Sequence, residues 1–344
     1  MEFFSTFLRR PSAGAILSLV AIIAFYVLVG RADISALVRA ASWLNFAANL
    51  GIVALPVGLL VIAGEIDISF GAMIPAGAIT TALISGHFGL PIGVGMLGAL
   101  GMGVVVGLIN GILTTRTQVP SLLITLGTLT IMQGVVLWSA MRLAGDASIP
   151  LKAPDWAKYI FGQLVGGSHQ VIILWWIFLA GIFSFVLHRT KYGNWIYALG
   201  GDKVSARNAG VPTERVTITL FILSAVAASF VGMCGAILFN TTQVSGGMSY
   251  IFNVIASVVV GGVLLTGGFG SVSGIFIGTL TFAIVNKGIS FTKINPNWAN
   301  FIIGVTLVLA MLMNEYFRKL ALTHSVKKKI NLGIPHRTAT VAED

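Results

Sequence analysis

The chain has 344 residues, of which 56% are hydrophobic and only 9% are charged. Because a soluble domain usually carries about 25% charged residues, this composition excludes a soluble enzyme or binding domain and indicates a polytopic membrane protein. The net charge of +10 is no sign of nucleic-acid binding, since the basic residues flank apolar runs and form no separate domain. We therefore expect an all-α bundle of transmembrane helices.

Ten apolar segments are candidate spans, because a helix needs about 20 apolar residues to cross a bilayer. They are, in chain order, Ala13–Gly30, Trp43–Ala63, Ser69–Phe88, Leu90–Leu113, Ser121–Ala140, Val171–Leu187, Val216–Asn240, Phe252–Thr266, Ser271–Ile289 and Trp298–Met313. The first resembles the core of a signal peptide, but it is too long for that role and no small-residue cleavage site follows it. We therefore expect it to be retained as a span.

The basic residues predict the orientation of the chain. With ten spans both termini share one side, and fourteen of the 21 lysines and arginines would lie there. Because cytoplasmic loops carry the excess of such residues, we expect both termini in the cytoplasm. The membrane domain would cover residues 1–316, with a cytoplasmic loop at 188–215, and residues 317–344 would form a cytoplasmic tail.

Two acids, Glu65 and Asp67, interrupt the apolar run that contains the second and third spans. A carboxylate at the centre of a transmembrane helix costs roughly 2.5–3.5 kcal/mol, so we expect a break between Gly64 and Ser69 that places both acids at a cytoplasmic turn. There Asp67 or Ser69 would cap the following helix by accepting a backbone N–H. A role in the transport path stays open, because acids within membrane segments are functional candidates by default.

Glycines recur at four-residue spacing inside the spans, where small residues let helix backbones approach closely. The two ladders are Gly103, Gly107, Gly111 and Gly270, Gly274, Gly278. A second glycine pattern hints at an internal duplication of the kind that many transporters show. It consists of two triplets that match at a constant offset: Gly58, Gly64, Gly71 and Gly261, Gly267, Gly274.

The longest polar stretch, His188–Arg215, carries the signature of a short helix. Asp202 is the predicted N-cap, Gly210 is the predicted left-handed stop, and Pro212 follows. A helix of about two turns is marginal in water on its own, so it must dock on another surface. That surface is either this chain's own cytoplasmic face or a separate cytoplasmic protein.

This stretch resembles the coupling segment of ribose-type ABC importer permeases, in the branched-chain and monosaccharide permease family. The resemblance lies in the run "GNWIYALGGD", which ends at Asp202, and in the residues after it, Ser205, Ala206, Arg207, Ala209 and Gly210. Other family-like stretches are "GEIDISFGA", "GLINGILTTRTQVPSLLITLGTLTIMQG" and "VIASVVVGGVLLTGGFGSVSGIFIGTL". Departures are Asp202, where the family usually has asparagine, and Tyr250–Asn253, where it commonly has Tyr-Glu-Leu-Asp.

The resemblance implies a type II-like permease subunit of an ATP-driven importer in the bacterial inner membrane. Its partners would be a cytoplasmic ABC ATPase, a periplasmic sugar-binding protein and a second permease copy. Its cargo would be a monosaccharide (a pentose or hexose) or a related polyol. The residues that it implies for coupling to the ATPase are Gly200, Gly201, Asp202, Ser205, Ala206, Arg207 and Gly210.

The sequence itself predicts a non-catalytic subunit. It lacks a G-x-x-x-x-G-K-[ST] phosphate loop, so any ATP that is used must be bound outside this chain. The resemblance implies that the partner ATPase binds the ATP and Mg²⁺. The five histidines are scattered, and no metal-ligand cluster or nucleophile–base pair is evident. We therefore expect no cofactor, no metal and no nucleic-acid partner for this chain.

Uncharged polar residues within the spans are candidates for the transport path, because amides suit neutral hydroxylated solutes. They are Asn45, Asn49, Asn110, Gln133, Asn240, Asn253 and Asn286. The alternative role for each is an interhelical hydrogen bond worth about 0.6 kcal/mol. In the outer loop, Trp156 and Tyr159 are candidate contacts for the binding protein or anchors at the membrane interface.

Two other functions stay open at this point. The same fold suits an ABC importer for a nucleoside or a furanosyl signal molecule, because the ligand would be selected mainly by the binding protein. An ATP-independent secondary transporter or channel would need an ion or proton site of its own, and the scarcity of acids within the spans argues against it.

Overall fold

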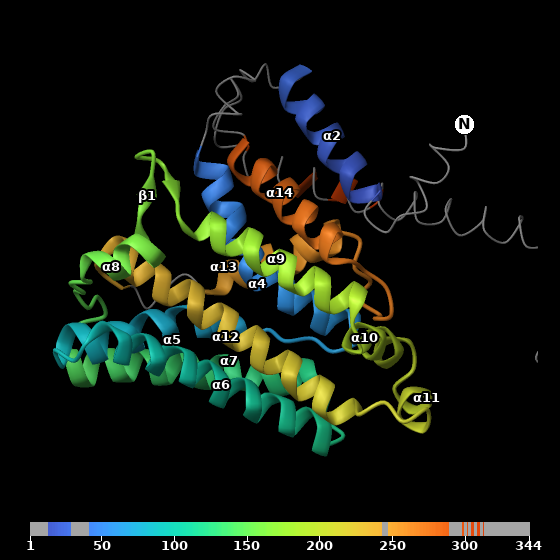
Figure 1. The fold of residues 1–344 in the computed structure, drawn as a ribbon, viewed down its shortest axis with the longest axis horizontal. Helices are drawn as coiled ribbons and strands as arrows, with labels where there is room; N and C mark the ends of the chain where they lie inside the picture. Colours follow the sequence, from blue (N-terminus) through green and yellow to red (C-terminus); the bar gives the residue numbers. More distant parts are fainter. Residues whose placement is uncertain are drawn as a thin grey trace, which may run out of the picture.

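The computed structural model of the chain describes residues 13–28, 41–242 and 247–288, with seven single positions between 298 and 312. Within these ranges the chain is almost wholly helical, which confirms the predicted all-α class (Figure 1). Apart from the single positions, the expected tenth span, Trp298–Met313, lies outside the described residues, as does the expected tail 317–344.

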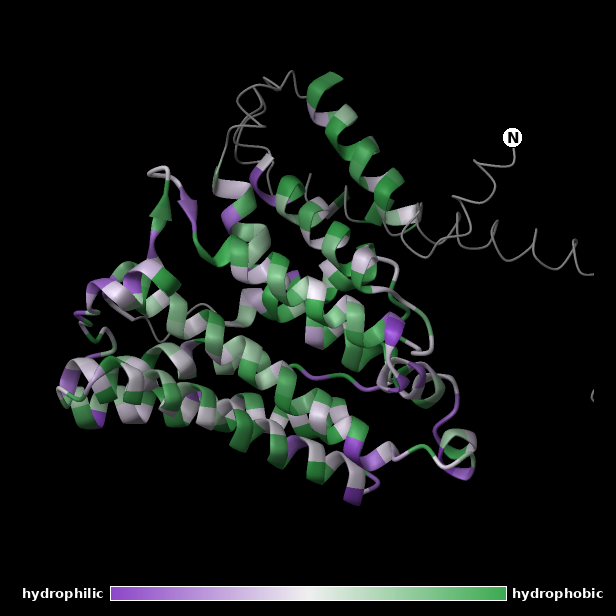
Figure 2. Cartoon of the chain, viewed as in Figure 1, coloured by the Kyte–Doolittle hydropathy of each residue, from purple (hydrophilic) through white to green (hydrophobic). Residues whose placement is uncertain are grey.

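The first nine predicted spans each overlap a described helix. These helices are α2 (Ala13–Leu28), α4 (Ala41–Ile62), α5 (Phe70–Ala82), α6 (Ile92–Arg116), α7 (Ser121–Ser139), α9 (Ile172–Arg189), α12 (Thr213–Phe239), α13 (Gly247–Val260) and α14 (Val272–Gly288). The π-helical turns η1 (Leu83–His87) and η2 (Ala140–Ala144) extend α5 and α7. Five of the described helices are long and apolar enough to cross a membrane: α4, α6, α7 with η2, α9 and α12. Figure 2 shows hydrophobic residues along the helices and hydrophilic residues gathered at the ends of the bundle.

One end of the bundle, here called the hairpin end, is formed by the segment between α7 and α9 (Figure 1). This segment contains α8 (Asp155–Ala157), the π-helical turn η3 (Lys158–Gly162) and the strands β1 (Leu164–Val165) and β2 (His169–Gln170). The strands pair antiparallel. The amide of Asn45 in α4 fastens the hairpin, because its Nδ2 donates to Ser168 O at 2.9 Å and its Oδ1 accepts from Gln170 N at 2.9 Å.

The opposite end, here called the α11 end, carries α10 (Lys191–Gly201) and α11 (Lys203–Asn208) (Figure 1). The predicted short helix is confirmed as α11, with Asp202 at its N-cap and Gly210 at a φ of 83° just beyond its end. The structure adds α10, which the sequence pattern did not predict. Thr190, in extended conformation, separates α10 from α9.

The first glycine ladder lies in the contact between α6 and α12, as its spacing predicts. A Cβ added at Gly103, Gly107 or Gly111 would meet the backbone of α12. It would lie 2.9 Å from Val226 Cα at Gly103 and 2.6 Å from Phe221 O at Gly107. The two helix axes can therefore lie this close only because glycines occupy these positions.

The chain breaks between α4 and α5, but not in the way that the sequence predicts. Residues 63–69, here called the extended segment, turn back at Gly64 (φ 87°) and enter the bundle without regular secondary structure before α5 begins at Phe70. Figure 2 shows this partly hydrophilic segment running among hydrophobic helices. Asp67 is only 1% exposed. The prediction that Asp67 lies at an interfacial turn is therefore wrong. Its carboxylate lies inside the bundle, where other groups of the protein bind it.

Side chains of α7 accept two of the backbone N–H groups of the extended segment. Ile66 N donates to Ser121 Oγ at 3.1 Å, and Ile68 N donates to Thr125 Oγ1 at 3.3 Å. Inside a membrane no water is available for these groups, so non-helical backbone is tolerated only where protein atoms satisfy it. The hydroxyls of α7 thus allow the span to begin without a helix.

Three chain segments meet at the α11 end without side chains between them. Gly268 N donates to Ile62 O at 2.8 Å. A Cβ added at Gly200 would strike Ile62 O, and one added at Gly267 would lie 2.9 Å from Gly64 Cα. Gly64 and Gly267, which occupy matching places in the two glycine triplets, have nearly the same φ, 87° and 84°.

This convergence generates a stability prediction. Gly200→Ala should lower the free energy of unfolding by about 1–3 kcal/mol, because the added methyl group forces a shift in a closely packed backbone contact. Thermal unfolding in detergent would measure the change. The control is Gly201→Ala, whose added Cβ has no atom within 4 Å. Equal stability of the two variants would contradict the prediction.

Candidate functional site

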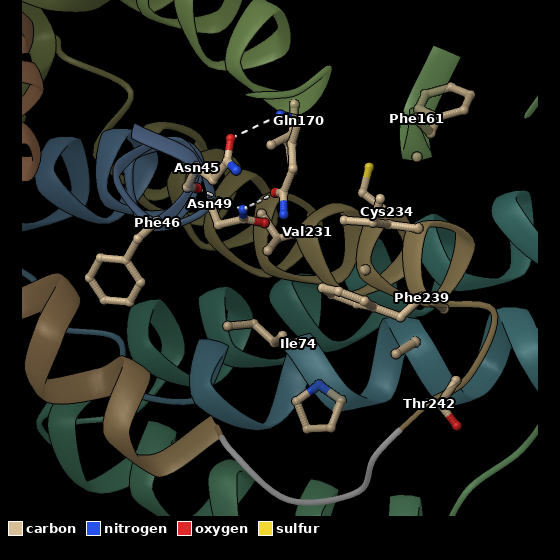
Figure 3. Close-up of a pocket in the computed structure, with 18 of the residues that line it drawn as sticks. Asn45, Phe46, Asn49, Ile74, Phe161, Gln170, Val231, Cys234, Phe239 and Thr242 are labelled. Atoms are coloured by element: carbon tan, nitrogen blue, oxygen red, sulfur yellow. Dashed lines mark hydrogen bonds between the residues drawn. The ribbon is translucent and has the colours of Figure 1, made fainter. Parts of the chain in front are cut away.

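A cavity of about 840 Å³ lies at the hairpin end of the bundle (Figure 3). Its walls come from α4, α5, α9, α12, α13, α14 and the segment around the hairpin. The residues that give it polar groups or aromatic surface are Ser42, Asn45, Phe46, Asn49, Phe161, Gln163, Gln170, Phe239, Thr241, Thr242, Tyr250 and Lys287. None of the described residues that line it is acidic.

An amide network forms one side of this cavity (Figure 3). Asn49 Nδ2 donates to Gln170 Oε1 at 2.8 Å and to Asn45 O at 2.8 Å. Since α4 supplies both asparagines and β2 supplies Gln170, the network also joins the hairpin to the bundle. The hydrogen bonds between these residues fix the orientation of the amide groups, whose remaining donors and acceptors face the cavity.

Aromatic rings and one cation complete the lining. The Lys287 ammonium lies 5.0 Å from the centroid of the Phe46 ring, within the range of a cation–π contact. Phe161 stacks on Trp175 with ring centroids 5.6 Å apart. The cavity therefore offers apolar ring faces beside polar groups, the combination usual for small-molecule sites.

The residues predicted for the transport path do not gather in one place. Asn45 and Asn49 line the cavity, whereas Asn110 is fully buried away from it. Gln133, Asn253 and Asn286 are partly buried on α7, α13 and α14 and do not line it, and exposed Asn240 ends α12 in a left-handed conformation.

Gln170, Thr241 and Thr242 line the cavity but were absent from the predicted path. They lie outside the apolar segments that the prediction searched. Their polar character in the loops that flank two spans is the only sequence signal for them.

A buried polar cluster surrounds the Asp67 carboxylate. Its Oδ1 accepts from Ser69 N at 2.8 Å and Ser69 Oγ at 2.6 Å, and its Oδ2 accepts from Ser224 Oγ in α12 at 2.7 Å. Ser69 is the N-cap of α5, and its side chain makes no capping bond. Asp67 thus orders the residue that starts α5 and at the same time binds α12.

The cluster extends to two further helices through Asn110. The amide Nδ2 of Asn110 in α6 donates to Ser69 Oγ at 2.9 Å, and its Oδ1 accepts from Thr128 Oγ1 in α7 at 2.6 Å. Asn110, a candidate for the transport path, therefore joins helices here. Four elements, α5, α6, α7 and α12, are connected through one carboxylate and its neighbours.

Helices α5 and α12 connect this cluster to the cavity. The cluster holds the start of α5 and Ser224 of α12, and the cavity wall includes Pro75 of α5 and Val231 of α12, further along the same helices. A Cβ added at Gly232 would strike Ile74 O, so the two backbones touch directly. The cluster and the cavity are therefore two parts of one packed unit.

Around α11, the residues that the family resemblance implies for coupling have different environments. Asp202 caps α11 by accepting from Ser205 N at 2.6 Å, and hydrogen bonds from the side chain and the backbone of Ser205 hold the pKa of the Asp202 carboxyl below its usual value. Gly201, Ser205 and Gly210 are accessible, whereas Gly200 is packed against Ile62.

Ala206 and Arg207, which the family resemblance implies for coupling, and the neighbouring Lys203 make contacts within this chain. Ala206 is buried against this chain, because it lies on the inner face of α11. Lys203 Nζ pairs with Glu65 Oε1 at 2.8 Å, and Arg207 Nη2 lies 3.7 Å from Glu214 Oε1. Both cations therefore have acidic partners within the chain. The exposed apolar side chain of α11 is Val204, at 68% exposure.

No metal site of the usual composition appears in the part of the chain that the structure describes, where no three His, Cys, Asp or Glu residues could hold an ion. Cys234 is a free, buried thiol on α12. Three polar features of the described chain, the cavity, the Asp67 cluster and the surface around α11, are therefore the candidates for function.

Comparison with known proteins matches residues 39–311 to the family described as branched-chain amino acid transport system / permease component. The probable ABC transporter permease protein y4mJ of Sinorhizobium fredii is 31% identical, over 81% of this chain and 83% of its own. The fructose import permease protein FrcC of Rhizobium meliloti is 28% identical, over 90% and 87%. The ribose import permease protein RbsC of Escherichia coli K12 is 26% identical, over 77% and 81%. No solved structure matches the chain.

The matched region includes the described helices from α4 to α14, the extended segment and the α10–α11 pair, whereas α2 precedes it. The apolar helices and this match make the protein a multi-pass inner-membrane protein. The chain belongs to this permease family, among the ribose-type permeases of sugar ABC importers.

Proposed function

We propose that this chain is the membrane subunit of an ATP-driven importer that carries a pentose, a hexose or a related polyol into the cytoplasm. The observation that carries the proposal is the cavity at the hairpin end. Its volume of about 840 Å³ falls within the ~300–1,000 Å³ of small-molecule sites. Relatives of this chain are named as permeases for fructose and ribose.

The lining chemistry suits a neutral hydroxylated ring. The amides of Asn45, Asn49 and Gln170 offer both donors and acceptors to hydroxyl groups, while the ring of Phe46 offers an apolar face. The charge of Lys287 is directed at that ring. A site without an acid among its described residues holds a neutral solute through hydrogen bonds, which a transporter can release.

The two ends of the bundle suit different partners. The hairpin end would face the periplasm, where Trp156 and Tyr159 are exposed and available to a sugar-binding protein. The α11 end would face the cytoplasm and a separate ATPase, with both termini on that side. A cleft of about 280 Å³ lies beside the exposed Val204, between the end of α6 and the start of α12. A second permease copy would complete the importer.

The proposal is tested by reconstituting the chain with its ATPase and binding protein in sealed vesicles. Uptake of labelled ribose, fructose or arabinose should require ATP and Mg²⁺ on the side of the ATPase. Uptake of a nucleoside in place of every sugar would favour the alternative cargo. Sugar uptake that continues without the ATPase would overturn the proposal in favour of a secondary transporter.

A bulky side chain in the cavity should block transport. Gly235→Phe on α12 should reduce ATP-driven uptake to background, because Gly235 lines the cavity and an added Cβ there meets no atom within 4 Å. The matched control is Gly134→Phe on α7, where an added Cβ is equally free but does not face the cavity. Normal uptake by Gly235→Phe at normal protein levels would exclude this cavity from the path.

An acid on the exposed face of α11 should weaken docking of the ATPase. Val204→Glu should lower co-purified ATPase by roughly tenfold, because docking would bury an unpaired charge. Val165→Glu, an exposed valine at the hairpin end, serves as the control and should leave the amount of co-purified ATPase unchanged. If Val204→Glu retains the ATPase as well as the control does, α11 is not the docking element.

A further inference from the structure

We propose that the ion pair between Lys203 and Glu65 is the link through which movement of α11 reaches the cavity, by way of the extended segment (residues 63–69). The two residues would be positioning residues for transport, since neither lines the cavity. The inference rests on the proposed function, in which α11 docks on the ATPase. It goes further by assigning the path of the coupling inside this chain.

Three polar or backbone contacts connect the α10–α11 pair to α4, to the turn before α14 and to the extended segment, besides the Arg207–Glu214 pair at the start of α12. Gly200 packs against Ile62 at the end of α4, and Tyr197 OH donates to Gly270 O at 2.8 Å, just before α14. The third contact is the 2.8 Å pair of Lys203 and Glu65. Among these three, the ion pair is the side-chain contact that reaches the extended segment, beside the close backbone approach of Gly200 to Gly64.

The ion pair is better placed to transmit force than a surface pair. The Glu65 side chain is 12% exposed and that of Lys203 50% exposed, and partly buried pairs are screened less by salt. Stability of α11 does not explain Lys203, because a cation in the first turn of a helix opposes the helix dipole. Its position is explained by the carboxylate that it binds in the extended segment.

From Glu65 the path continues through Asp67. The Asp67 carboxylate is buried and takes its hydrogen bonds from Ser69 and Ser224. Separating a buried carboxylate from its donors leaves an uncompensated charge, which is strongly unfavourable. A displacement of the extended segment should therefore carry Ser224 of α12 and the start of α5 with it.

The last step is the contact between α5 and α12. An added Cβ at Gly77 of α5 would strike Ser229 O, and one at Gly232 of α12 would strike Ile74 O, so the two backbones interlock. Both helices line the cavity, α5 with Pro75 and α12 with Val231. A shift transmitted by Asp67 therefore moves two walls of the cavity together.

The test is the charge pair itself, in the reconstituted importer. Glu65→Gln and Lys203→Gln should each lower sugar uptake per ATP hydrolysed by about tenfold, a factor typical of coupling between sites. Lys203→Arg should retain coupling, because it keeps the positive charge. The exchange of both residues (Glu65→Lys with Lys203→Glu) should restore the coupling that either neutral variant loses. The neutral control is Lys191→Gln, an exposed lysine at the start of α10.

Co-purification of the ATPase separates coupling from docking, since Glu65 is mostly buried and should not alter docking. If the unaltered importer shows no ATP-driven uptake, the proposed function fails. If it transports and Glu65→Gln remains fully coupled, only the present inference fails. If Glu65→Gln loses both sugar uptake and the co-purified ATPase, the inference is also overturned, because the ion pair would then serve assembly of the importer.

Discussion

The constraint on which the rest of the structure depends is the need of the extended segment for hydrogen-bond partners inside a membrane. Every backbone group there must be satisfied by protein. Ser121 and Thr125 of α7 receive two N–H groups, and the Asp67 carboxylate receives a third from Ser69. These bonds join α7 and the start of α5 to the extended segment. Side-chain oxygens of an acid and of hydroxyls thus accept backbone N–H groups in this non-helical segment, as backbone carbonyls do within the helices.

A second requirement is the absence of side chains where segments cross. The end of α4, the end of α10 and the turn before α14 meet through Gly64, Gly200, Gly267 and Gly268, where a Cβ would strike backbone or require a strained conformation. Gly64 and Gly267 share both their place in the two glycine triplets and their φ. The glycine content of the chain therefore serves two purposes, close helix packing and the crossing of non-helical segments.

Features that depend on neighbouring residues could be predicted from the sequence. The cap at Asp202, the stop at Gly210 and the α6 glycine ladder each follow from local spacing. The burial of Asp67 could not be predicted, because its partner Ser224 lies 157 positions further along the chain. Similarly, the inward face of Ala206 depends on how α11 docks, and Gln170 joins the cavity only because Asn45 and Asn49 bind it.

The fastening of the hairpin by Asn45 has a consequence for how this surface can change. The Asn45 amide binds Ser168 O and Gln170 N, which are backbone atoms that any residue at those positions would supply. Side chains at the tip and on the exposed strand β1, Leu164 and Val165, are therefore free to vary while the loop keeps its place. One asparagine thus separates the shape of this surface from its chemistry, so that the residues it presents can diverge between related permeases while the scaffold stays the same.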